Sequence, residues 1–415
     1  MTASPAHPAA EGRDGLGERA ARTLTAELAR HAGPKSALVV GAAPGSAVLQ
    51  SAIDTLLPGD SLVVTPGTGT TTAALRAHVH QQGQWVGDRV RVAESVGESD
   101  AAQIVIVAEP LTGSAEDARA TIDGLAKYLA DGGVLSIAAP ALPGLTGGAA
   151  AELDRQAALF GVGSDLVLAN RPPVRVHRLR FSPADAAAAE RLAPAYRPSS
   201  VPVTRGMHID SNGVAAAGIA FGLAALARRA RPSSKLWLVP ALAALPVAAF
   251  FRDPERDVPE DASAVVAASD GKVLSVERLT DDRFGDGEFL RIAVFLSVLD
   301  VHVNRAPVAG KVVDYFVADG GYAAAMKPAA EHNVAAYTVL DTPRGTVVVA
   351  QRTGLIARRI VQRAPVGALL ARGERFGLIR FGSRTDIYLP AEAADALVAP
   401  GDRVLGGASV VARWR

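Results

Sequence analysis

The sequence predicts an α/β domain followed by a mainly β domain, with a pair of apolar helices between them. Short apolar runs alternate with helical patterns up to about residue 180, which favours a parallel sheet with helices on both faces. From residue 263 onward, short strand-like runs are separated by Gly, Pro and Asp without a long helical pattern. The 415 residues exceed one ordinary core of roughly 100–200 residues, which also favours two domains.

The first half contains five apolar runs that are the expected strands of the parallel sheet. A helical pattern over Ala115–Leu129 ends just before Asp131-Gly-Gly133. Residues 164–180 then predict an antiparallel pair of strands that turns at Arg171-Pro-Pro173. The expected parallel strands are Ser36–Val40, Ser61–Thr65, Val90–Ala93, Gln103–Ala108 and Val134–Ala138.

Two segments flanking this α/β domain, expected over residues 31–185, are predicted to lack a core of their own. Residues 1–30 are polar and contain no apolar stretch of the 7–15 residues typical of a signal peptide, so we expect a flexible tail. Ala and Pro become frequent between about residues 186 and 205 and the alternation of strands and helices stops, which predicts a linker.

Two apolar runs, Val214–Ala227 and Leu236–Phe251, predict a helical hairpin within residues 206–252. Each run is shorter than the roughly 17–25 residues that span a bilayer. The loop between them is basic, from Arg228 to Lys235, and a spanning hairpin would place it opposite the domains, against the positive-inside tendency. We therefore expect the hairpin to lie in the membrane interface with its basic residues near anionic headgroups; a buried helical pair in a soluble core is the alternative.

The bulk composition excludes several classes of function. The net charge is +1 and charged residues make up 20% of the chain, which is not the footprint of a nucleic-acid-binding protein. The absence of cysteine excludes disulfides, thiolate catalysis and cysteine-based zinc sites, and no metal site is expected.

The most informative stretch of the second half is Glu374–Pro390, where the pair Gly382-Ser383 stands between two apolar strands. Taken alone, such a pair is typical of a turn or a bulge. Taken with Phe295–Pro307 and with Phe250-Phe-Arg-Asp-Pro-Glu-Arg256, it resembles the phosphatidylserine decarboxylase proenzyme family, in its short Phe-Gly-Ser-Arg form. The resemblance covers about residues 205–415 and implies a decarboxylase domain over residues 253–415.

The resemblance implies that the chain cuts itself between Gly382 and Ser383. Attack by the Ser383 hydroxyl on the Gly382 carbonyl gives an ester, and elimination followed by hydrolysis converts Ser383 into a pyruvoyl group. The ketone of that group then forms a Schiff base with phosphatidylserine, which is decarboxylated to phosphatidylethanolamine. The mature enzyme would retain its own cleaved small chain as a partner.

Asp270 and His302 are the catalytic residues that the resemblance implies beside Ser383. Asp270 stands in an Asp-Gly turn, and His302 is the first histidine of the family pattern Asp-x-His-x-x-His. The second histidine of that pattern is replaced here by Arg305, so the proton path of self-cleavage departs from the family. His302 remains for proton transfer, with an ordinary pKa of about 6.5; a satisfied core histidine is the alternative.

The substrate carries a phosphate and a carboxylate, which match the guanidinium group of arginine. Asn333 survives from a family block that otherwise differs here, and it is a candidate loop contact to the substrate. Arg358 and Arg359 are neighbours in a strand-like run, so at most one of them is expected to reach the site. The candidate substrate-binding residues are Arg305, Arg358, Arg359, Arg384 and Asn333.

The turn Val39-Val-Gly-Ala-Ala-Pro-Gly45 follows a strand and resembles the glycine turn of class I methyltransferases, which implies a Rossmann-like, methyltransferase-like fold. Gly41 and Gly45 are therefore candidate contacts to S-adenosylmethionine. The second strand ends in Thr65-Pro-Gly67, without the acidic residue that holds ribose hydroxyls.

These observations favour a self-processing phosphatidylserine decarboxylase attached peripherally to the cytoplasmic face of the cell membrane, with self-association possible. One alternative is an unprocessed lipid-binding or scaffold protein that kept the fold without the chemistry. Another is a bifunctional enzyme whose first domain is an active methyltransferase.

Overall fold

The computed structural model describes residues 15–141, 147–194, 200–355, 359–380 and 383–415. The chain divides into two compact units, Met1–Pro183 and Ala184–Arg415, and each is described by itself. The boundary falls two residues before the end of the predicted α/β domain.

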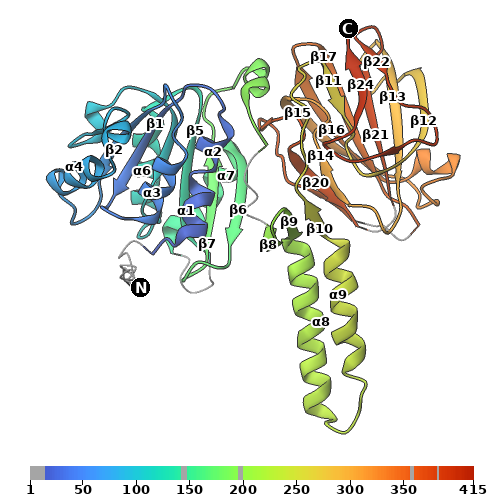
Figure 1. Ribbon diagram of the computed structural model, residues 1–415, viewed down its shortest axis with the longest axis horizontal. Helices are drawn as coiled ribbons and strands as arrows, with labels where there is room; N and C mark the ends of the chain where they lie inside the picture. Colours follow the sequence, from blue (N-terminus) through green and yellow to red (C-terminus); the bar gives the residue numbers. More distant parts are fainter. Residues whose placement is uncertain (1–14, 142–146, 195–199, 356–358, 381–382) are drawn as a thin grey trace, which may run out of the picture. The chain divides into compact units, whose positions relative to one another are not determined.

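Unit 1 is built on a seven-stranded sheet with the order β3-β2-β1-β4-β5-β7-β6 (Figure 1). The first five strands pair in parallel, and β7 pairs antiparallel with both β5 and β6. This order, with its reversed strand near one edge, is that of the class I methyltransferase fold and confirms the predicted Rossmann-like class. The strands are β1 (Ser36–Ala42), β2 (Ser61–Pro66), β3 (Val90–Val92), β4 (Ala102–Val107), β5 (Leu129–Pro140), β6 (Gly161–Val167) and β7 (Val174–Leu179).

Helices cover both faces of this sheet. One buried cluster joins α1, α2 and α3 to β1, β2 and β4, and a second joins α6 and α7 to the opposite face. The helices are α1 (Glu18–Leu24), α2 (Ala26–Arg30), α3 (Ala47–Asp54), α4 (Thr72–Gln81), α5 (Gln84–Gly87), α6 (Ala115–Ala126) and α7 (Gly148–Phe160), with a short 3-10 turn at Val96–Glu98.

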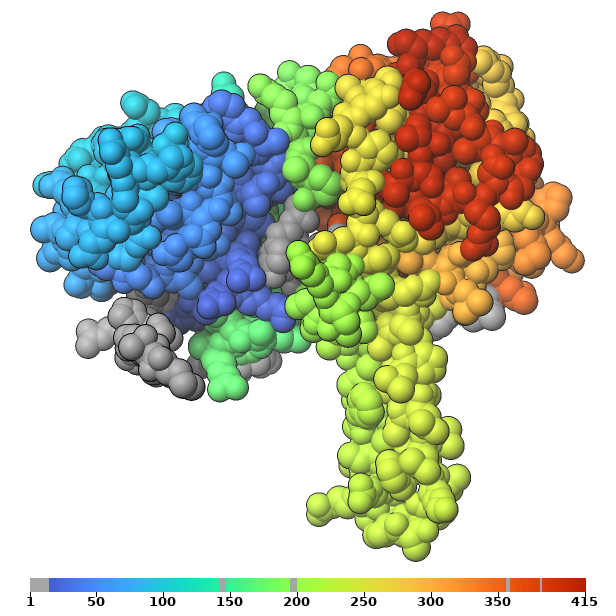
Figure 2. Space-filling view, in the orientation of Figure 1, coloured from blue at the N-terminus to red at the C-terminus, as the bar shows by residue number. Residues whose placement is uncertain are grey.

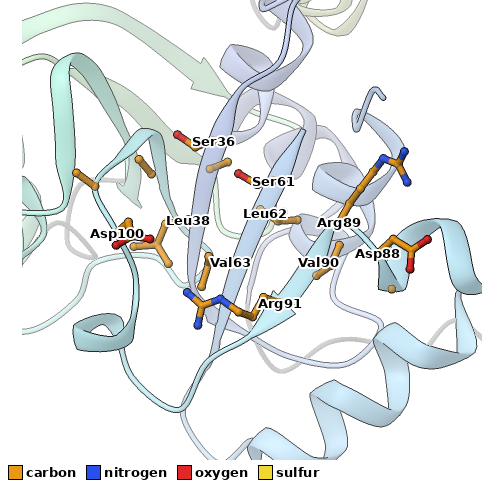
Figure 3. A pocket seen from close by; sticks show the side chains of 14 residues that line it. Ser36, Leu38, Ser61, Leu62, Val63, Asp88, Arg89, Val90, Arg91 and Asp100 are labelled. Carbon is orange, nitrogen blue, oxygen red and sulfur yellow. The ribbon is translucent and has the colours of Figure 1, made fainter. Parts of the chain in front are cut away.

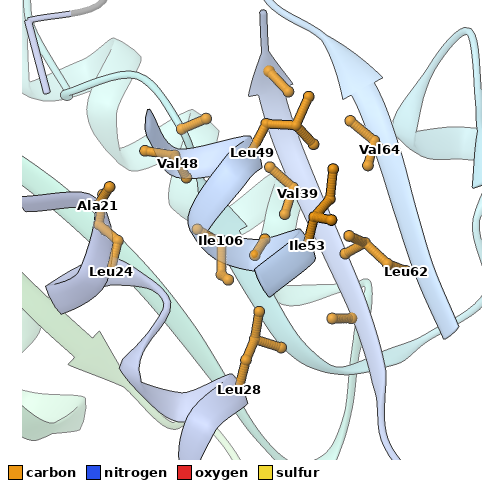
Figure 4. Close-up of a cluster of buried hydrophobic side chains, with 14 of the residues drawn as sticks. Ala21, Leu24, Leu28, Val39, Val48, Leu49, Ile53, Leu62, Val64 and Ile106 are labelled. Carbon is orange, nitrogen blue, oxygen red and sulfur yellow. The ribbon is translucent and has the colours of Figure 1, made fainter. Parts of the chain in front are cut away.

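The prediction of a flexible tail over residues 1–30 is wrong for α1 and α2. Ala21, Leu24 and Leu28 are fully buried and point toward the strands (Figure 4). The small alanines of this segment let the helices approach the sheet closely. Because the segment contains few large apolar residues, its sequence does not look like that of a packed helix. Residues 1–14 lie outside the described residues.

Unit 2 begins with the predicted linker, part of which is packed instead of free. The 3-10 helix Ala186–Arg191 and the following Leu192 bury small side chains against Leu369 and Ala371. Strands β8 (Ser200–Thr204) and β9 (Met207–Asp210) then pair with each other, and β9 also pairs with β10 (Arg252–Pro254). The alanine-rich composition therefore indicated close packing here, and residues 195–199 lie outside the described part.

The apolar hairpin consists of α8 (Ser211–Ala230) and α9 (Leu238–Phe250), which run side by side (Figure 1). Helix α8 is 20 residues long and is the one described helix that is long and apolar enough to cross a membrane, by length and composition alone. It is longer than the apolar run in the sequence because Ser211–Gly213 and Arg228–Ala230 extend it at both ends.

The rest of unit 2 is a sandwich of antiparallel strands, which confirms the predicted mainly β domain. Its largest sheet has eight strands in the order β19-β15-β16-β17-β21-β13-β12-β23. Two three-stranded sheets, β14-β20-β18 and β11-β24-β22, complete the described part of the sandwich.

The elements of this sandwich follow one another in short connections. They are β11 (Ala264–Val266), β12 (Gly271–Thr280), β13 (Glu288–Leu296), β14 (Val303–Arg305), β15 (Gly310–Ala318), a 3-10 helix (Pro328–His332), β16 (Ala335–Thr342), β17 (Gly345–Arg352), β18 (Ile360–Gln362), β19 (Leu369–Leu370), β20 (Arg375–Ile379), β21 (Ser383–Pro390), β22 (Ala394–Ala396), β23 (Arg403–Val404) and β24 (Val410–Trp414).

Candidate active site

Ser383 is the first residue of β21 and lies opposite Leu296 of β13. Its side chain is fully buried, and its Oγ has no hydrogen-bond partner among the described residues. A buried hydroxyl normally finds a partner, because leaving it unpaired costs about 1–3 kcal/mol. The Ser383 hydroxyl is therefore held in the interior without a hydrogen bond to the part of the chain that the structure describes. Gly382 lies outside the described residues.

The polar neighbours of Ser383 lie on the same face of β21. Because side chains alternate along a strand, Ser383 and Thr385 point to one face. The Thr385 hydroxyl lies 2.6 Å from the hydroxyl of Ser269, so the segment that carries Asp270 contacts this face of the strand. The strand pairing thus brings together two stretches of sequence that are more than a hundred residues apart.

Asp270 is buried and accepts two hydrogen bonds. Arg256 Nη2 donates to its Oδ2 at 2.7 Å, and the backbone N–H of Gly406 donates to its Oδ1 at 2.8 Å. Burial raises the pKa of Asp270 above its ordinary value, although Arg256 opposes the shift. The following Gly271 has φ +150°, and a Cβ there would lie 2.1 Å from the Phe295 carbonyl oxygen, so the Asp-Gly turn requires glycine.

His302 is buried beside the end of β20. Its Nδ1 lies 2.9 Å from the carbonyl oxygen of Asp300, to which a protonated Nδ1 donates, while its Nε2 is buried without a described partner. The Phe250 ring lies 4.2 Å from the imidazole, centroid to centroid. Burial lowers the pKa of His302 to about 4, so the ring is neutral at physiological pH and Nε2 carries a free lone pair.

A backbone hydrogen bond joins His302 to β20, the strand that precedes Ser383 in the sequence. The N–H of Ile379, the last residue of β20, donates to the His302 carbonyl oxygen at 3.2 Å. The chain then passes through Arg380 and residues 381–382 to Ser383. His302 Nε2 and Ser383 Oγ are both buried, and neither has a hydrogen-bond partner among the described residues.

Arg305 lies in a buried ion pair. Its Nη2 donates to Asp253 Oδ1 at 3.2 Å and to the Pro254 carbonyl oxygen at 2.7 Å, and its Nη1 donates to the Gly373 carbonyl oxygen. Arg375 Nε donates to the same Asp253 carboxylate at 2.7 Å. The arginine that replaces the second family histidine is thus bound to the aspartate of the Phe250–Arg256 block, and these contacts favour a structural role over the predicted role in substrate binding.

Replacing Asp253 with asparagine should destabilise the protein strongly. The change removes the anion that Arg305 and Arg375 share in a site where all three side chains are buried. Breaking a buried pair in this way costs about 3–5 kcal/mol, because a charge is left without compensation. Thermal unfolding should show a lower midpoint for Asp253→Asn. The matched change Asp395→Asn, in an exposed pair with Arg415, should leave the midpoint unchanged, and equal effects of the two would contradict the structural role.

Arg384 points to the face of β21 opposite Ser383. Its Nε donates to Asp386 Oδ1 at 2.6 Å, and Arg352 Nε donates to the other oxygen of the same carboxylate at 2.7 Å. Burial raises the pKa of Asp386, but the two arginines outweigh it and hold this pKa below the ordinary value. As placed, Arg384 is committed to this buried cluster and not to the Ser383 face.

The other predicted substrate contacts are Asn333, Arg358 and Arg359. Asn333 closes its own loop, donating to the Thr353 carbonyl oxygen at 2.7 Å and exchanging hydrogen bonds with Ala323. Arg359 is exposed, and Arg358 lies outside the described residues. Among the predicted site residues that the structure describes, Asp270 is linked to the Ser383 face through Ser269 and Thr385, and His302 is linked by its backbone to Ile379.

A pair of buried amides near Ser383 was missed in the sequence. Gln351 of β17 lies opposite Thr385 and donates through Nε2 to Asn304 Oδ1 of β14 at 2.7 Å. Asn304 Nδ2 and Gln351 Oε1 have no described partner. The sequence did contain an indication of this pair. Each of the strands Val303–Arg305 and Gly345–Arg352 carries one amide side chain, and an amide buried inside a protein needs a polar partner.

The predicted glycine turn of unit 1 lies at the carboxyl end of β1. Gly41 and Gly45 both adopt left-handed backbone conformations, at φ +81° and +72°. Glu109, which follows β4, accepts from Thr68 N at 2.9 Å, and a Cβ on Gly67 would lie 2.5 Å from its Oε1. The carboxylate at this edge therefore holds the loop after β2, which offers no acidic residue of its own. The glycine turn is therefore present, but the acidic residue expected after β2 to hold ribose hydroxyls is missing.

A cavity of about 360 Å³ in unit 1 lies at the other edge of the sheet, where the strands begin (Figure 3). Ser36, Ser61 and Val90 are the first residues of their strands and all line it. Ligands of such sheets bind at the carboxyl ends of the strands, so this cavity is not at the cofactor edge.

We expect no binding of S-adenosylmethionine to the folded protein. Calorimetric titration should give no saturable heat, because Glu109 is already bonded to the loop that would face the ribose. Saturable heat with one site per chain would contradict this prediction. Repeating the titration with Glu109→Ala tests whether this carboxylate alone prevents binding.

Comparison with known proteins matches the second half of the chain to a known family. Residues 244–412 match the family model for phosphatidylserine decarboxylase. The phosphatidylserine decarboxylase proenzyme of Symbiobacterium thermophilum is 48% identical over 166 residues, covering 40% of this chain and 77% of that protein. The proenzyme of Carboxydothermus hydrogenoformans is 44% identical over 165 residues, covering 40% and 78%.

The similar solved structures align with a comparable share of this chain. Precorrin-6y C5,15-methyltransferase from Geobacter metallireducens is 17% identical, covers 39% of this chain and 87% of its own, and has a TM-score of 0.29.

Proposed function

Because the chain belongs to the phosphatidylserine decarboxylase family, we propose that it matures by cutting itself at Gly382–Ser383 and that Ser383 becomes a pyruvoyl group. The family supports decarboxylation of phosphatidylserine as the reaction. The single observation that supports the cleavage site is the buried Ser383 hydroxyl without a described partner, at the first residue of a strand.

The proposed cleavage balances within this chain plus one water molecule. Ser383 Oγ attacks the Gly382 carbonyl carbon, and the Gly382–Ser383 amide becomes an ester. Loss of the Ser383 α-proton expels the Gly382 carboxylate and leaves a dehydroalanine at the new amino terminus. Water then replaces the amino nitrogen, which leaves as ammonia. His302 Nε2 is the proposed acceptor for the hydroxyl proton, because it is neutral and carries a free lone pair.

The pyruvoyl group supplies a ketone that captures the substrate amine and a carbonyl that draws electrons as carbon dioxide leaves. Around it, Asp270 and Arg256 fix the turn beside Thr385. His302 Nε2 is the proposed proton relay: it takes up the proton that the substrate ammonium loses as the Schiff base forms and returns it to the headgroup carbon. The amide of Asn304 offers a further hydrogen-bond donor in the same interior.

Mass spectrometry of the purified protein tests the proposal directly. We expect a large chain that ends at Gly382 and a small chain of residues 383–415, roughly 3–4 kDa, that begins with a pyruvoyl group. An intact chain with an unmodified Ser383, in a preparation that decarboxylates phosphatidylserine, would overturn it.

The apolar hairpin supports a location at the membrane surface. Helices α8 and α9 expose large apolar side chains along their length. The hairpin that they form projects from the rest of unit 2 (Figure 2), and residues 228–235 at its tip are rich in arginine and lysine. An exposed surface of this kind is typical of contact with lipid. We propose peripheral attachment to the cytoplasmic face of the cell membrane. Alkaline carbonate should release the protein from isolated membranes; retention would favour a hairpin that spans the bilayer.

A further inference from the structure

Two apolar side chains near the hairpin base are exposed in the loop that leads to His302. Leu299 is 82% exposed and Val298 is 51% exposed, between β13 and β14. Single exposed apolar residues are common on protein surfaces. This pair is unusual because the loop that carries it is held in one shape and is joined to the hairpin.

Hydrogen bonds hold the loop as a closed turn from Ser297 to Asp300. Ser297 donates to Asp300 Oδ2 through its N–H at 2.8 Å and through its hydroxyl at 2.7 Å, and Asp300 N–H donates to the Ser297 carbonyl oxygen at 2.9 Å. Arg403 Nη2 donates to Asp300 Oδ1 at 2.9 Å. The turn therefore presents Val298 and Leu299 outward and cannot easily fold them in.

The hairpin base contacts the turn and the site. Arg252, which follows α9, donates to the Leu299 carbonyl oxygen and, through Nη1, to the Ala249 carbonyl oxygen at 3.2 Å. The ring of Phe250, the last residue of α9, packs against the imidazole of His302 at an angle of 38°. Arg380, shortly before Ser383, donates to Asn212 Oδ1 in the first turn of α8 at 2.6 Å. The turn, the hairpin base and the residues that flank Ser383 thus form one connected structure.

We propose that the turn Ser297–Asp300 inserts Val298 and Leu299 into an anionic bilayer beside the hairpin, and thereby holds the His302 end of the decarboxylase domain against the lipid headgroups. The proposal rests on the proposed membrane contact of the hairpin and adds a second point of contact. The substrate is itself a bilayer lipid, and Arg252 brings positive charge to this rim, whereas the charge of Arg403 is paired with Asp300. Phosphatidylserine then presents its headgroup to the site without leaving the bilayer.

Site-specific labelling tests the proposal, because the chain contains no cysteine and one introduced thiol is unique. Leu299→Cys, labelled with a fluorophore sensitive to polarity, should shift to the blue on vesicles of phosphatidylcholine and phosphatidylglycerol. Leu242→Cys on α9 should also shift, and Leu397→Cys, beyond β22 at the end of the domain away from the hairpin, should not (Figure 1). A shift at Leu242 without one at Leu299 would overturn the proposal and leave the hairpin contact standing; no shift at either would overturn both.

A second variant tests how this membrane contact affects vesicle binding and decarboxylation. Leu299→Asp should weaken binding to these vesicles by about tenfold, since one large apolar side chain loses its burial in lipid. Its decarboxylation of a short-chain, soluble phosphatidylserine should equal that of the unaltered enzyme, which shows that the site has survived. Leu397→Asp should change neither measurement. Equal losses on vesicles and on the soluble substrate would overturn the proposal, because they would place Leu299 in the site itself.

Discussion

Replacing Ser383 with alanine should leave one uncut chain of 42.7 kDa and abolish decarboxylation. Without the hydroxyl, no ester can form at the Gly382 carbonyl and no electrophile replaces it. The buried Oγ has no described partner, so its removal leaves no polar group unpaired and should not damage the fold. We expect the free energy of unfolding of Ser383→Ala to be close to that of the unaltered protein. Denaturing gels and release of carbon dioxide from labelled phosphatidylserine measure the two effects.

The matched control is Ser263→Ala, a serine of the same domain whose hydroxyl donates to the exposed Asp261. It should be cut and should retain full activity. Circular dichroism should show the same β-rich spectrum for both variants, which separates lost chemistry from lost structure. Two chains from Ser383→Ala, or activity in the uncut variant, would contradict the proposed origin of the electrophile.

The sequence predicted the architecture well where a local pattern determines it. Apolar strands separated by helical stretches gave the sheet of unit 1, and turn residues between short strands gave the sandwich of unit 2. The hairpin was also visible, because its two apolar runs are continuous. Its first helix is longer than expected, since flanking polar residues join the helix at both ends.

The predicted flexible segments were wrong where alanine side chains form the buried contacts. Helices α1 and α2 and the 3-10 helix Ala186–Arg191 were assigned to a tail and a linker, but all three bury small side chains. Alanine contributes little hydrophobic signal in a sequence, yet it permits close approach of backbones. A composition rich in alanine therefore did not distinguish a flexible segment from a tightly packed one.

Pairings between distant residues could not be predicted either. Arg305 was expected at the substrate, but it lies against Asp253, which is 52 positions away in the chain. Arg384 was expected beside the headgroup, although strand alternation directs it to the face opposite Ser383. The alternation of side chains along a strand could have indicated the position of Arg384. The position of Arg305 depends on how β10 and β14 meet in the fold, which the sequence does not show.

Replacing His302 with glutamine should lower the decarboxylation rate of the cut enzyme by about 10²–10⁴-fold, the usual contribution of a positioned acid or base. Glutamine is similar in size but cannot take up a proton and return it. Self-cleavage should slow as well, and a gel separates that effect because the rate is normalised to the cut fraction. The exposed His332, changed in the same way, should have no effect on either step.

The pH dependence distinguishes proton transfer by His302 from a packing role against Phe250. Because burial lowers the pKa of His302 to about 4, the folded protein keeps the ring neutral where the unfolded chain, with a pKa near 6.5, is protonated. Stability should therefore fall as pH drops from about 6.5 to about 4, by about 3 kcal/mol from this group, and His302→Gln should remove that part of the slope. Activity of the unaltered enzyme should persist down to about pH 5 and decline as Nε2 becomes protonated. If His302→Gln flattened the stability curve but kept the full rate of decarboxylation, His302 would be a core residue and the proton would have to come from elsewhere.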